Sequence, residues 1–217
     1  LRFHFPNVKV AVLNQDFPKE DIEVIVVDGG SHDRTVALAK QYPFYIVEGH
    51  KNRALQMNEG AKCAKGDAFL FLHADCLLDA DGIKAIHAAL ENGYVGGCLR
   101  QRIQSRKAIF RWIETSGNLR AKLFKIFYGD QAIFARRDVF FKIGGFDNVD
   151  LFDDVMFSKK LKRAGKVCRV NKKVYTSARR WQKQGIVKTT LINWLLTLGF
   201  SIGISPNILR KLYFDVR

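Results

Sequence analysis

The 217-residue sequence has few prolines, few cysteines and no internal repeat, and each shortage excludes a class of protein. The 4 prolines and the absence of a low-complexity tract argue against a disordered or linker-like chain. Without self-similarity at solenoid periods, a repeat architecture is excluded. The length suits one α/β domain with a sizeable core and is short for two.

The four cysteines are far apart and form no Cys-x-x-Cys pair; they are Cys63, Cys76, Cys98 and Cys168. This spacing predicts reduced, structural thiols and argues against a zinc site. Residues 1–7 lack the charged and apolar regions of a secretory signal peptide. We therefore expect a cytoplasmic protein, which can also bind at the inner face of the membrane.

Acidic residues are also scarce, with 21 Asp and Glu against 36 Lys and Arg, which gives a net charge of +15. Such an excess suits a polyanionic partner, namely a nucleic acid, an anionic membrane or a phosphorylated small molecule. The basic residues are scattered along the chain and no nucleic-acid motif is present. We therefore expect no nucleic-acid partner.

Strand-like runs alternate with helical periodicity in the first half of the chain. Strands are expected at 8–13, 22–27, 44–47 and 68–72, and helices at 36–43, 52–65 and 79–92. This alternation predicts an α/β fold with a mostly parallel sheet and helices on both faces. Ligands bind beyond the carboxyl ends of strands in such sheets. Asp28 and Asp75 both fall at such ends.

The second half is less regular. We expect a basic, aromatic helical stretch at 100–127, a strand at 131–135, a helix at 137–143, a turn at 144–146, a helix at 153–164 and strands at 167–170 and 173–177. An apolar helical tail follows from 185 to 205. Its run at 191–204 is shorter than the ~20 residues that span a membrane. It can pack on the domain or lie on a membrane surface, flanked by Lys188, Arg210 and Lys211.

Two strand-end carboxylates are candidates for binding a nucleotide. Asp75, two residues after His73, can hold Mg²⁺ or Mn²⁺ against a substrate diphosphate, or it can simply turn the chain or cap the next helix. Asp28, followed by Gly29, can accept hydrogen bonds from a nucleoside, although the same residues alone indicate only a turn. Together the two acidic ends predict one binding crevice.

A second acidic site, Asp153 and Asp154, opens the helix expected at 153–164. The pair either complements the helix dipole or supplies a general base. Because adjacent helical side chains do not share a face, we expect only one of the two to reach the substrate. Arg180 and Trp181 can clamp a leaving diphosphate and stack on a sugar or base, or they can form a solvated basic turn.

These motifs, in this order, resemble the family 2 glycosyltransferases of the GT-A fold over roughly residues 8–181. The matching segments are the VVDGGSHDRT run at 26–35, the helical Ala54, Asn58 and Gly60, the His73-Ala74-Asp75 counterpart of Asp-x-Asp, the Gly144-Gly145-Phe146 turn, the acidic pair Asp153-Asp154, and 177–181. Segments at 53–58, 72–75, 129–131 and 176–181 are similar to a bacterial subgroup labelled arsenosugar-biosynthesis-type glycosyltransferases. From that label we take the reaction class and not the sugar.

The resemblance implies an inverting, metal-dependent transfer from a UDP- or GDP-linked sugar to an unknown hydroxyl acceptor. In that scheme Asp154 is the base, Asp153 orients it, and Asp75 binds Mn²⁺ or Mg²⁺. The implied nucleotide-sugar residues are Asn14, Asp28, Gly29, Arg53, Asn58, His73, Ala74, Asp75, Arg180 and Trp181. Asp130 and Gln131 are the implied acceptor residues. The GT-A domain would cover 1–184, with a nucleotide-sugar half at 1–98 and an acceptor half at 99–184, before the tail at 185–217.

Several positions depart from the family pattern. His73 replaces the first Asp of Asp-x-Asp, Gly29 replaces a second Asp, and Ala11 and Gln15 replace Pro and Glu. The 15–22 segment is too short for the helix that the family places there. These departures leave open a degenerate GT-A-like protein that acts as a binding or scaffold module. A nucleotidyltransferase would use similar metal chemistry, but its glycine-rich phosphate loop is missing.

Overall fold

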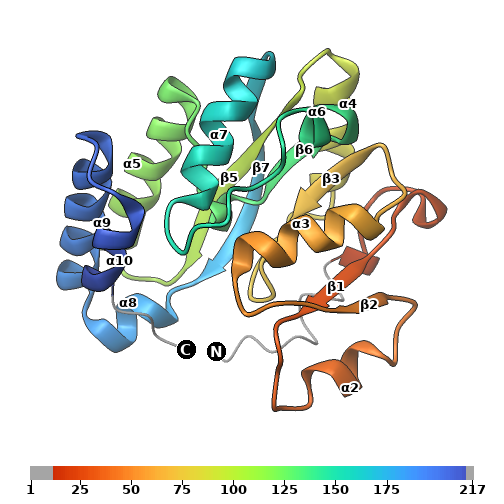
Figure 1. Cartoon of the computed structure of the whole chain (residues 1–217), viewed down its shortest axis with the longest axis horizontal. Coiled ribbons are helices and arrows are strands. Elements are labelled where there is room, and N and C mark those ends of the chain that lie inside the picture. The colour runs from red at the N-terminus through yellow and green to blue at the C-terminus, as the bar shows by residue number, and fades with distance from the viewer. Residues whose placement is uncertain (1–11, 214–217) are drawn as a thin grey trace.

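A five-stranded sheet forms the centre of the protein, seen in a computed structural model that describes residues 12–213 (Figure 1). Its strand order is β3-β6-β5-β7-β4, and a second sheet holds only β1 and β2. The strands are β1 Ile25–Asp28, β2 Tyr45–Glu48, β3 Ala68–Phe71, β4 Leu77–Leu78, β5 Gly96–Gln104, β6 Ile133–Arg136 and β7 Val167–Ser177.

The expected α/β class is confirmed, but the expectation of a mostly parallel sheet is wrong for the described strands. β1 pairs with β2 and β5 pairs with β7 in parallel. The β3–β6, β5–β6 and β4–β7 pairs are antiparallel. An apolar run indicates that a strand is buried, but it does not encode the direction of the strand.

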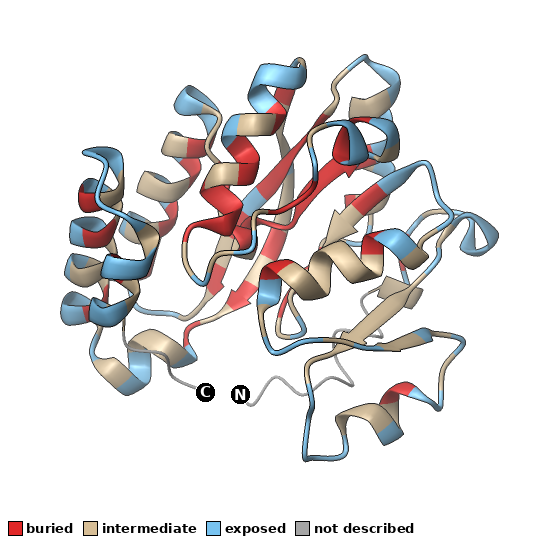
Figure 2. Cartoon of the chain, viewed as in Figure 1, coloured by how far each residue is buried: buried red, intermediate tan, exposed pale blue. Residues whose placement is uncertain are grey.

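Helices cover both faces of the large sheet, as expected. They are α2 Thr35–Ala39, α3 Arg53–Cys63, α4 Gly82–Glu91, α5 Ile109–Phe124, α6 Arg137–Lys142 and α7 Asp153–Ala164, with short 3-10 turns η1 Lys19–Asp21 and η2 Gly129–Gln131. Alternate strand residues face opposite layers. Phe69 and Ile133 join the core under α3, α6 and α7, whereas Leu70 and Phe134 pack on the α4 side. Figure 2 shows buried residues along the large sheet and on parts of the helices that cover it.

β5 corrects the helix expected at 100–127, because residues up to Gln104 are strand and α5 begins only at Ile109. Two glycines let β5 fit between its neighbours. A methyl group added at Gly96 would lie 2.5 Å from the Phe134 carbonyl oxygen, and one added at Gly97 would lie 2.0 Å from that of Cys168. The requirement for glycine is therefore tertiary, and no local pattern signals it.

Two further expectations change near the ends of the described chain. Of the strand expected at 8–13, residues 8–11 lie outside the described residues, and Val12 and Leu13 are helical. The strands expected at 167–170 and 173–177 are one strand, β7, whose pairing with β5 shifts register between Leu99 and Arg100. A bulge of this kind lets a strand continue through an irregular stretch.

The tail consists of helices α8 Arg179–Gln184, α9 Ile186–Ser201 and α10 Pro206–Leu212. Leu196 and Leu209 pack against Phe152 and Val155 at the start of α7. The Phe152 and Phe200 rings stack at 4.5 Å. One side of the tail is thus packed on the domain, and no helix within residues 12–213 is long and apolar enough to cross a membrane.

Candidate active site

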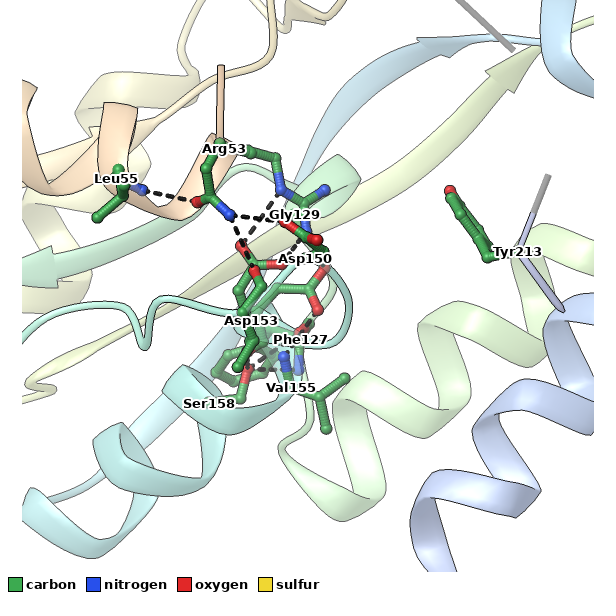
Figure 3. A network of polar contacts seen from close by, with 12 residues as sticks. Arg53, Leu55, Phe127, Gly129, Asp150, Asp153, Val155, Ser158 and Tyr213 are labelled. Atoms are coloured by element: carbon green, nitrogen blue, oxygen red, sulfur yellow. Dashed lines mark hydrogen bonds and ion pairs between the residues drawn. The ribbon is translucent and has the colours of Figure 1, made fainter. Parts of the chain in front are cut away.

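Arg53 joins two helix N-termini at the centre of the candidate site (Figure 3). It lies at the start of α3, and Asp153 and Asp154 lie at the start of α7. The Arg53 guanidinium contacts both carboxylate oxygens of Asp153, with Nε 3.2 Å from Oδ2, and its Nη2 is 3.6 Å from Asp154 Oδ2. The acidic pair predicted from sequence is therefore held by a residue of α3, 100 positions earlier in the chain than Asp153.

The two acidic residues have different environments. The Asp153 side chain is 2% exposed and both of its oxygens face Arg53, whereas that of Asp154 is 12% exposed. Asp154 Oδ2 accepts from the Gly129 N–H at 2.7 Å, and Oδ1 accepts from the Val155 N–H at 2.8 Å. Asp154 is thus fixed by peptide groups and is the more accessible of the pair.

The negative charges of Asp153 and Asp154 keep the Arg53 guanidinium protonated. Burial alone would lower the pKa of the Arg53 guanidinium, but the charges of Asp154 and Asp153 outweigh it and raise that pKa above its ordinary value. Burial, followed by the charge of Asp154, raises the pKa of Asp153, and Arg53 opposes the rise. One cation therefore balances two closely spaced carboxylates.

The turn after β3 gathers three metal-binding groups. A ring nitrogen of His73, a carboxylate oxygen of Asp75 and the sulfur of Cys76 all lie within 4.8 Å of one another. The turn is closed by the Cys76 N–H, which donates to the His73 carbonyl at 3.0 Å. The cysteine spacing predicts only a structural thiol at Cys76, and the structure instead places this thiol beside the predicted metal ligand.

Gly129 lies between this turn and the acidic pair. A methyl group at Gly129 would lie 2.9 Å from His73 Nε2 and 3.4 Å from Asp154 Oδ2, so the position has no room for a side chain. His73 Nε2 is buried and has no hydrogen-bond partner among the described residues. Burial, and then the charge of Arg53, lower the pKa of His73 to about 4, so its imidazole is neutral near pH 7.

The two predicted acceptor residues, both in η2, behave differently. Asp130 Oδ2 accepts from Gln101 Nε2, and its Oδ1 is buried without a partner in the described part of the chain. Burial is the main reason that the pKa of Asp130 rises to about 6. Gln131 is fully buried, and its Oε1 accepts from Arg120 Nη2 and the Tyr128 N–H, each at 3.1 Å. Gln131 therefore holds the loop and is not brought to the surface of the site.

Asn58 also has a structural use in this conformation. Its Nδ2 donates to the Phe146 carbonyl at 2.8 Å, and its Oδ1 accepts from the Phe146 N–H at 2.9 Å. These bonds tie α3 to the Gly144–Phe146 turn, where Gly145 has a φ of 61°. Asn58 and the Gly144–Phe146 turn, which the sequence indicates separately, are thus joined by these two hydrogen bonds.

The nucleoside candidates lie at the end of β1. Asp28 Oδ2 accepts from the N–H groups of Gly30 and Ser31, each at 3.0 Å. Burial opposes these bonds, but they prevail and lower the pKa of Asp28. Gly29 packs on α3, where an added methyl group would lie 2.1 Å from Gln56 Nε2.

Four other residues predicted for the nucleotide-sugar site take no part in the contacts around Arg53. Asn14 and Ala74 are exposed. The Arg180 Nη1 donates to the Tyr213 hydroxyl at 2.6 Å, and the Trp181 ring packs on Phe110 at 5.9 Å instead of lying open for stacking.

Tyr213 and Gly129 are not among the individual site residues predicted from sequence. Tyr213 lies apart from the network in Figure 3 and is joined to a predicted site residue, Arg180, which donates to its hydroxyl. The Gly129-Asp130-Gln131 run is visible as a motif, whereas nothing in the local pattern marks Tyr213.

Comparisons with known proteins agree with this architecture. The family described as "Glycosyl transferase family 2" matches residues 9–147. A "PGL/p-HBAD biosynthesis glycosyltransferase" of Mycobacterium bovis is 31% identical over 135 residues, which cover 58% of this chain and 52% of the relative. A Methanococcus voltae "Dolichyl N-acetyl-alpha-D-glucosaminyl phosphate 3-beta-D-2,3-diacetamido-2,3-dideoxy-beta-D-glucuronosyltransferase" is 34% identical over 79 residues, 33% of this chain and 25% of the relative. The chain thus spans about half, or less, of the length of these relatives.

Solved structures show the same fold. S. aureus TarS 1-349 in complex with UDP superposes with a TM-score of 0.63 at 17% identity, covering 80% of this chain and 56% of that one. The UDP-GlcNAc complex of the same protein gives a TM-score of 0.60, with coverage of 80% and 54%. The family match extends over more than half of the chain and includes β1, α3 and the His73–Cys76 turn. The chain therefore belongs to glycosyl transferase family 2.

Proposed function

We propose that the protein transfers a sugar from a UDP- or GDP-linked donor to a hydroxyl acceptor, with inversion at the anomeric carbon and with a divalent metal. The observation that carries the proposal is the meeting at Gly129 of the His73–Cys76 turn and the Asp154 carboxylate. The UDP and UDP-GlcNAc complexes of TarS support a nucleotide-sugar donor. The likeness to the arsenosugar-biosynthesis-type subgroup, and a cytoplasmic location, stay predictions.

The donor set of the turn fits a divalent cation. Asp75 would be the main ligand, with His73 and Cys76 close enough to join it. Asp75 would supply the carboxylate oxygen that both Mn²⁺ and Mg²⁺ prefer, and the neutral His73 imidazole could supply a nitrogen ligand beside it. A bound cation would supply charge neutralisation for the departing diphosphate.

Asp154 is the proposed general base. The N–H groups of Gly129 and Val155 fix its two oxygens at the N-terminus of α7, and it is the more exposed member of the acidic pair. The acceptor hydroxyl gives its proton to Asp154, and the acceptor oxygen forms a bond to the anomeric carbon. The bond from that carbon to the diphosphate oxygen breaks, and its electron pair leaves with the nucleoside diphosphate. Asp153 acts as a positioning residue through Arg53.

The positions of the other predicted residues suggest which part of the donor each would bind. Asp28, with Gly29 and Asn14, would hold the nucleoside, and Arg53 and Arg180 would face the diphosphate. Asn58 would position α3 through Phe146. We divide the chain as expected from sequence, with a nucleotide-sugar half at 1–98, an acceptor half at 99–184 and a tail at 185–217. The proposal includes peripheral membrane contact by the tail.

Metal-dependent donor binding tests the proposal most directly. Calorimetry with UDP and GDP, with and without Mn²⁺, should show that the metal tightens binding of one nucleotide. Asp75→Asn should remove that gain while the thermal unfolding midpoint stays close to wild type. Asp67→Asn, an exposed carboxylate before β3, is the matched control and should keep the gain. An unchanged effect of Mn²⁺ in Asp75→Asn would refute the metal assignment.

A further inference from the structure

α5 buries two polar side chains together with two apolar ones. Its buried side consists of Phe110, Glu114, Asn118 and Ala121. Its exposed side carries large apolar residues, namely Ile109, Trp112, Leu119, Leu123 and Phe124. Trp112 is 74% exposed. A surface helix normally turns its apolar stripe to the core, so the outer face of α5 is built to contact something other than water.

α9 and α10 likewise expose large apolar side chains. Thr189, Leu196 and Gly199 are buried on the inner side of α9, and Leu209 is buried on that of α10. The outer side of α9 exposes Val187, Leu191, Trp194, Leu195 and Leu198, Ile202 is exposed directly after the helix, and α10 exposes Ile208 and Leu212. The exposed apolar positions of α9 follow helical spacing, so they form one stripe along the helix.

These helices adjoin one another at one end of the molecule. Figure 1 shows α5, α9 and α10 together, and Phe110 and Ile113 of α5 pack in one cluster with Trp181 and Ile186 of the tail. Among residues 12–213, every exposed large hydrophobic side chain lies on α5, on α9, on α10 or in the α9–α10 loop, except Tyr45 and Phe141. We call this combined face of α5, α9 and α10 the apolar end.

The charge around the apolar end identifies its partner. The segment 105–127 contains Arg106, Lys107, Arg111, Arg120, Lys122 and Lys125, and its one acidic residue, Glu114, is buried against Arg111 and Arg102. The segment 178–213 contains Arg179, Arg180, Lys183, Lys188, Arg210 and Lys211 and no Asp or Glu. A second copy would bring like charges together, which disfavours self-association. Apolar side chains with a basic surround and two tryptophans suit an anionic lipid surface.

We propose that the apolar end docks on an anionic membrane with α5 as an equal half of the contact, the helices lying in the interface without crossing it. The inference rests on the proposed peripheral contact of the tail, and vesicle binding can be measured without the transfer reaction. It extends that contact to a helix of the catalytic domain, so docking fixes the orientation of the whole domain and not only of the tail. The contact joins apolar burial to electrostatic attraction, and each part has its own test.

Vesicle flotation of the full chain tests this orientation. The chain should float with phosphatidylcholine vesicles that contain phosphatidylglycerol, and not with phosphatidylcholine alone. Binding should fall steeply between roughly 0.05 and 0.5 M salt, because the basic contribution is screened. Absence of binding to anionic vesicles at low salt would overturn the proposal.

Matched double variants separate the two halves of the apolar end. Trp112→Gln with Leu123→Gln changes α5, and Trp194→Gln with Leu198→Gln changes α9. Each pair should weaken partitioning about tenfold or more, because two apolar side chains no longer enter the interface. Tyr45→Gln, an exposed aromatic away from the apolar end, should leave partitioning unchanged. Wild-type partitioning of the α5 pair would limit docking to the tail and overturn the inference.

Light scattering and nucleotide binding distinguish membrane docking from self-association and from damage to the candidate site. Light scattering without vesicles should show a monomer, and a dimer that both double variants abolish would assign the apolar end to self-association instead. Mn²⁺-dependent nucleotide binding should be unchanged in both double variants, because the mutated side chains lie outside the candidate site. Loss of vesicle binding with intact nucleotide binding affects only this inference, and the converse affects only the proposed transfer activity.

Discussion

Asp130→Asn should stabilise the protein near neutral pH, because the native fold holds this carboxylate at a cost. Asp130 Oδ1 is buried without a hydrogen-bond partner among the described residues, and Asp154 adds a like charge nearby. Burial is the main cause that raises the pKa of Asp130 from 3.8 to about 6, while Arg120 opposes the rise. A neutral amide of the same shape removes the charge and can still accept the hydrogen bond from Gln101.

The pKa shift sets the size and the sign of the effect. Between pH 3.8 and about 6 the unfolded chain releases the Asp130 proton while the native chain keeps it, so stability falls as pH rises through this window. A pKa shift of about two units corresponds to a destabilisation of the native fold by at most ~3 kcal/mol. This destabilisation is fully present above pH 6 and absent below about pH 4. The value is an upper bound because Asp130 keeps some contact with solvent.

Urea unfolding of wild type and Asp130→Asn at about pH 4.5 and 7.5 measures this difference. The gain of the variant should be larger at the higher pH by up to ~2 kcal/mol, because about 1 kcal/mol of the effect is already present at pH 4.5. In thermal unfolding this difference corresponds to roughly 4–8 °C in the midpoint. Comparing the two proteins at each pH cancels the titration of unrelated groups. Asp67→Asn, the exposed control, should change stability by less than ~0.5 kcal/mol at both pH values. A gain for Asp130→Asn that is equal at both pH values would refute the reasoning.

Two other substitutions test the acidic pair and the link between α3 and the 144–146 turn. Asp154→Asn should lower turnover by about 10²–10⁴-fold and leave donor binding nearly intact, whereas Asp153→Asn should have a smaller or mixed effect. Steady-state kinetics with an identified acceptor decide this, and wild-type turnover of Asp154→Asn would place the base elsewhere. Asn58→Ala should cost about 1–3 kcal/mol in urea unfolding, because the Phe146 N–H and carbonyl lose their partner. A cost within experimental error would mean that water replaces the amide.

Local signals allow some elements to be predicted closely. α7 begins at Asp153 and ends at Ala164 as expected, because acidic residues mark its first turn and Gly165 follows its last. α3 likewise begins after Asn52, whose side chain accepts from the Leu55 N–H as an N-cap. Both helices are specified by residues within or beside them.

Features that depend on tertiary contact cannot be predicted in the same way. The local pattern places the second half of β5 in a helix, whereas the glycines of this strand are required by the Phe134 and Cys168 backbones and not by sequence neighbours. The resemblance indicates Arg53 and Asp153 separately, but their contact joins residues 100 positions apart. Trp181 is a residue type that can stack on a sugar or base, but in the structure its ring packs on Phe110.

Arg180 shows how the tail and the candidate site depend on each other. The sequence predicts that its guanidinium binds the donor diphosphate, and in the structure it donates to the Tyr213 hydroxyl at 2.6 Å and lies 4.2 Å over the Tyr213 ring. Tyr213 directly follows α10, and the outer side of α10 belongs to the apolar end. Under the role proposed for Arg180, the diphosphate would share this guanidinium with the Tyr213 hydroxyl. By linkage, any surface that fixes α10 must alter diphosphate affinity to the extent that it strengthens or weakens this same contact.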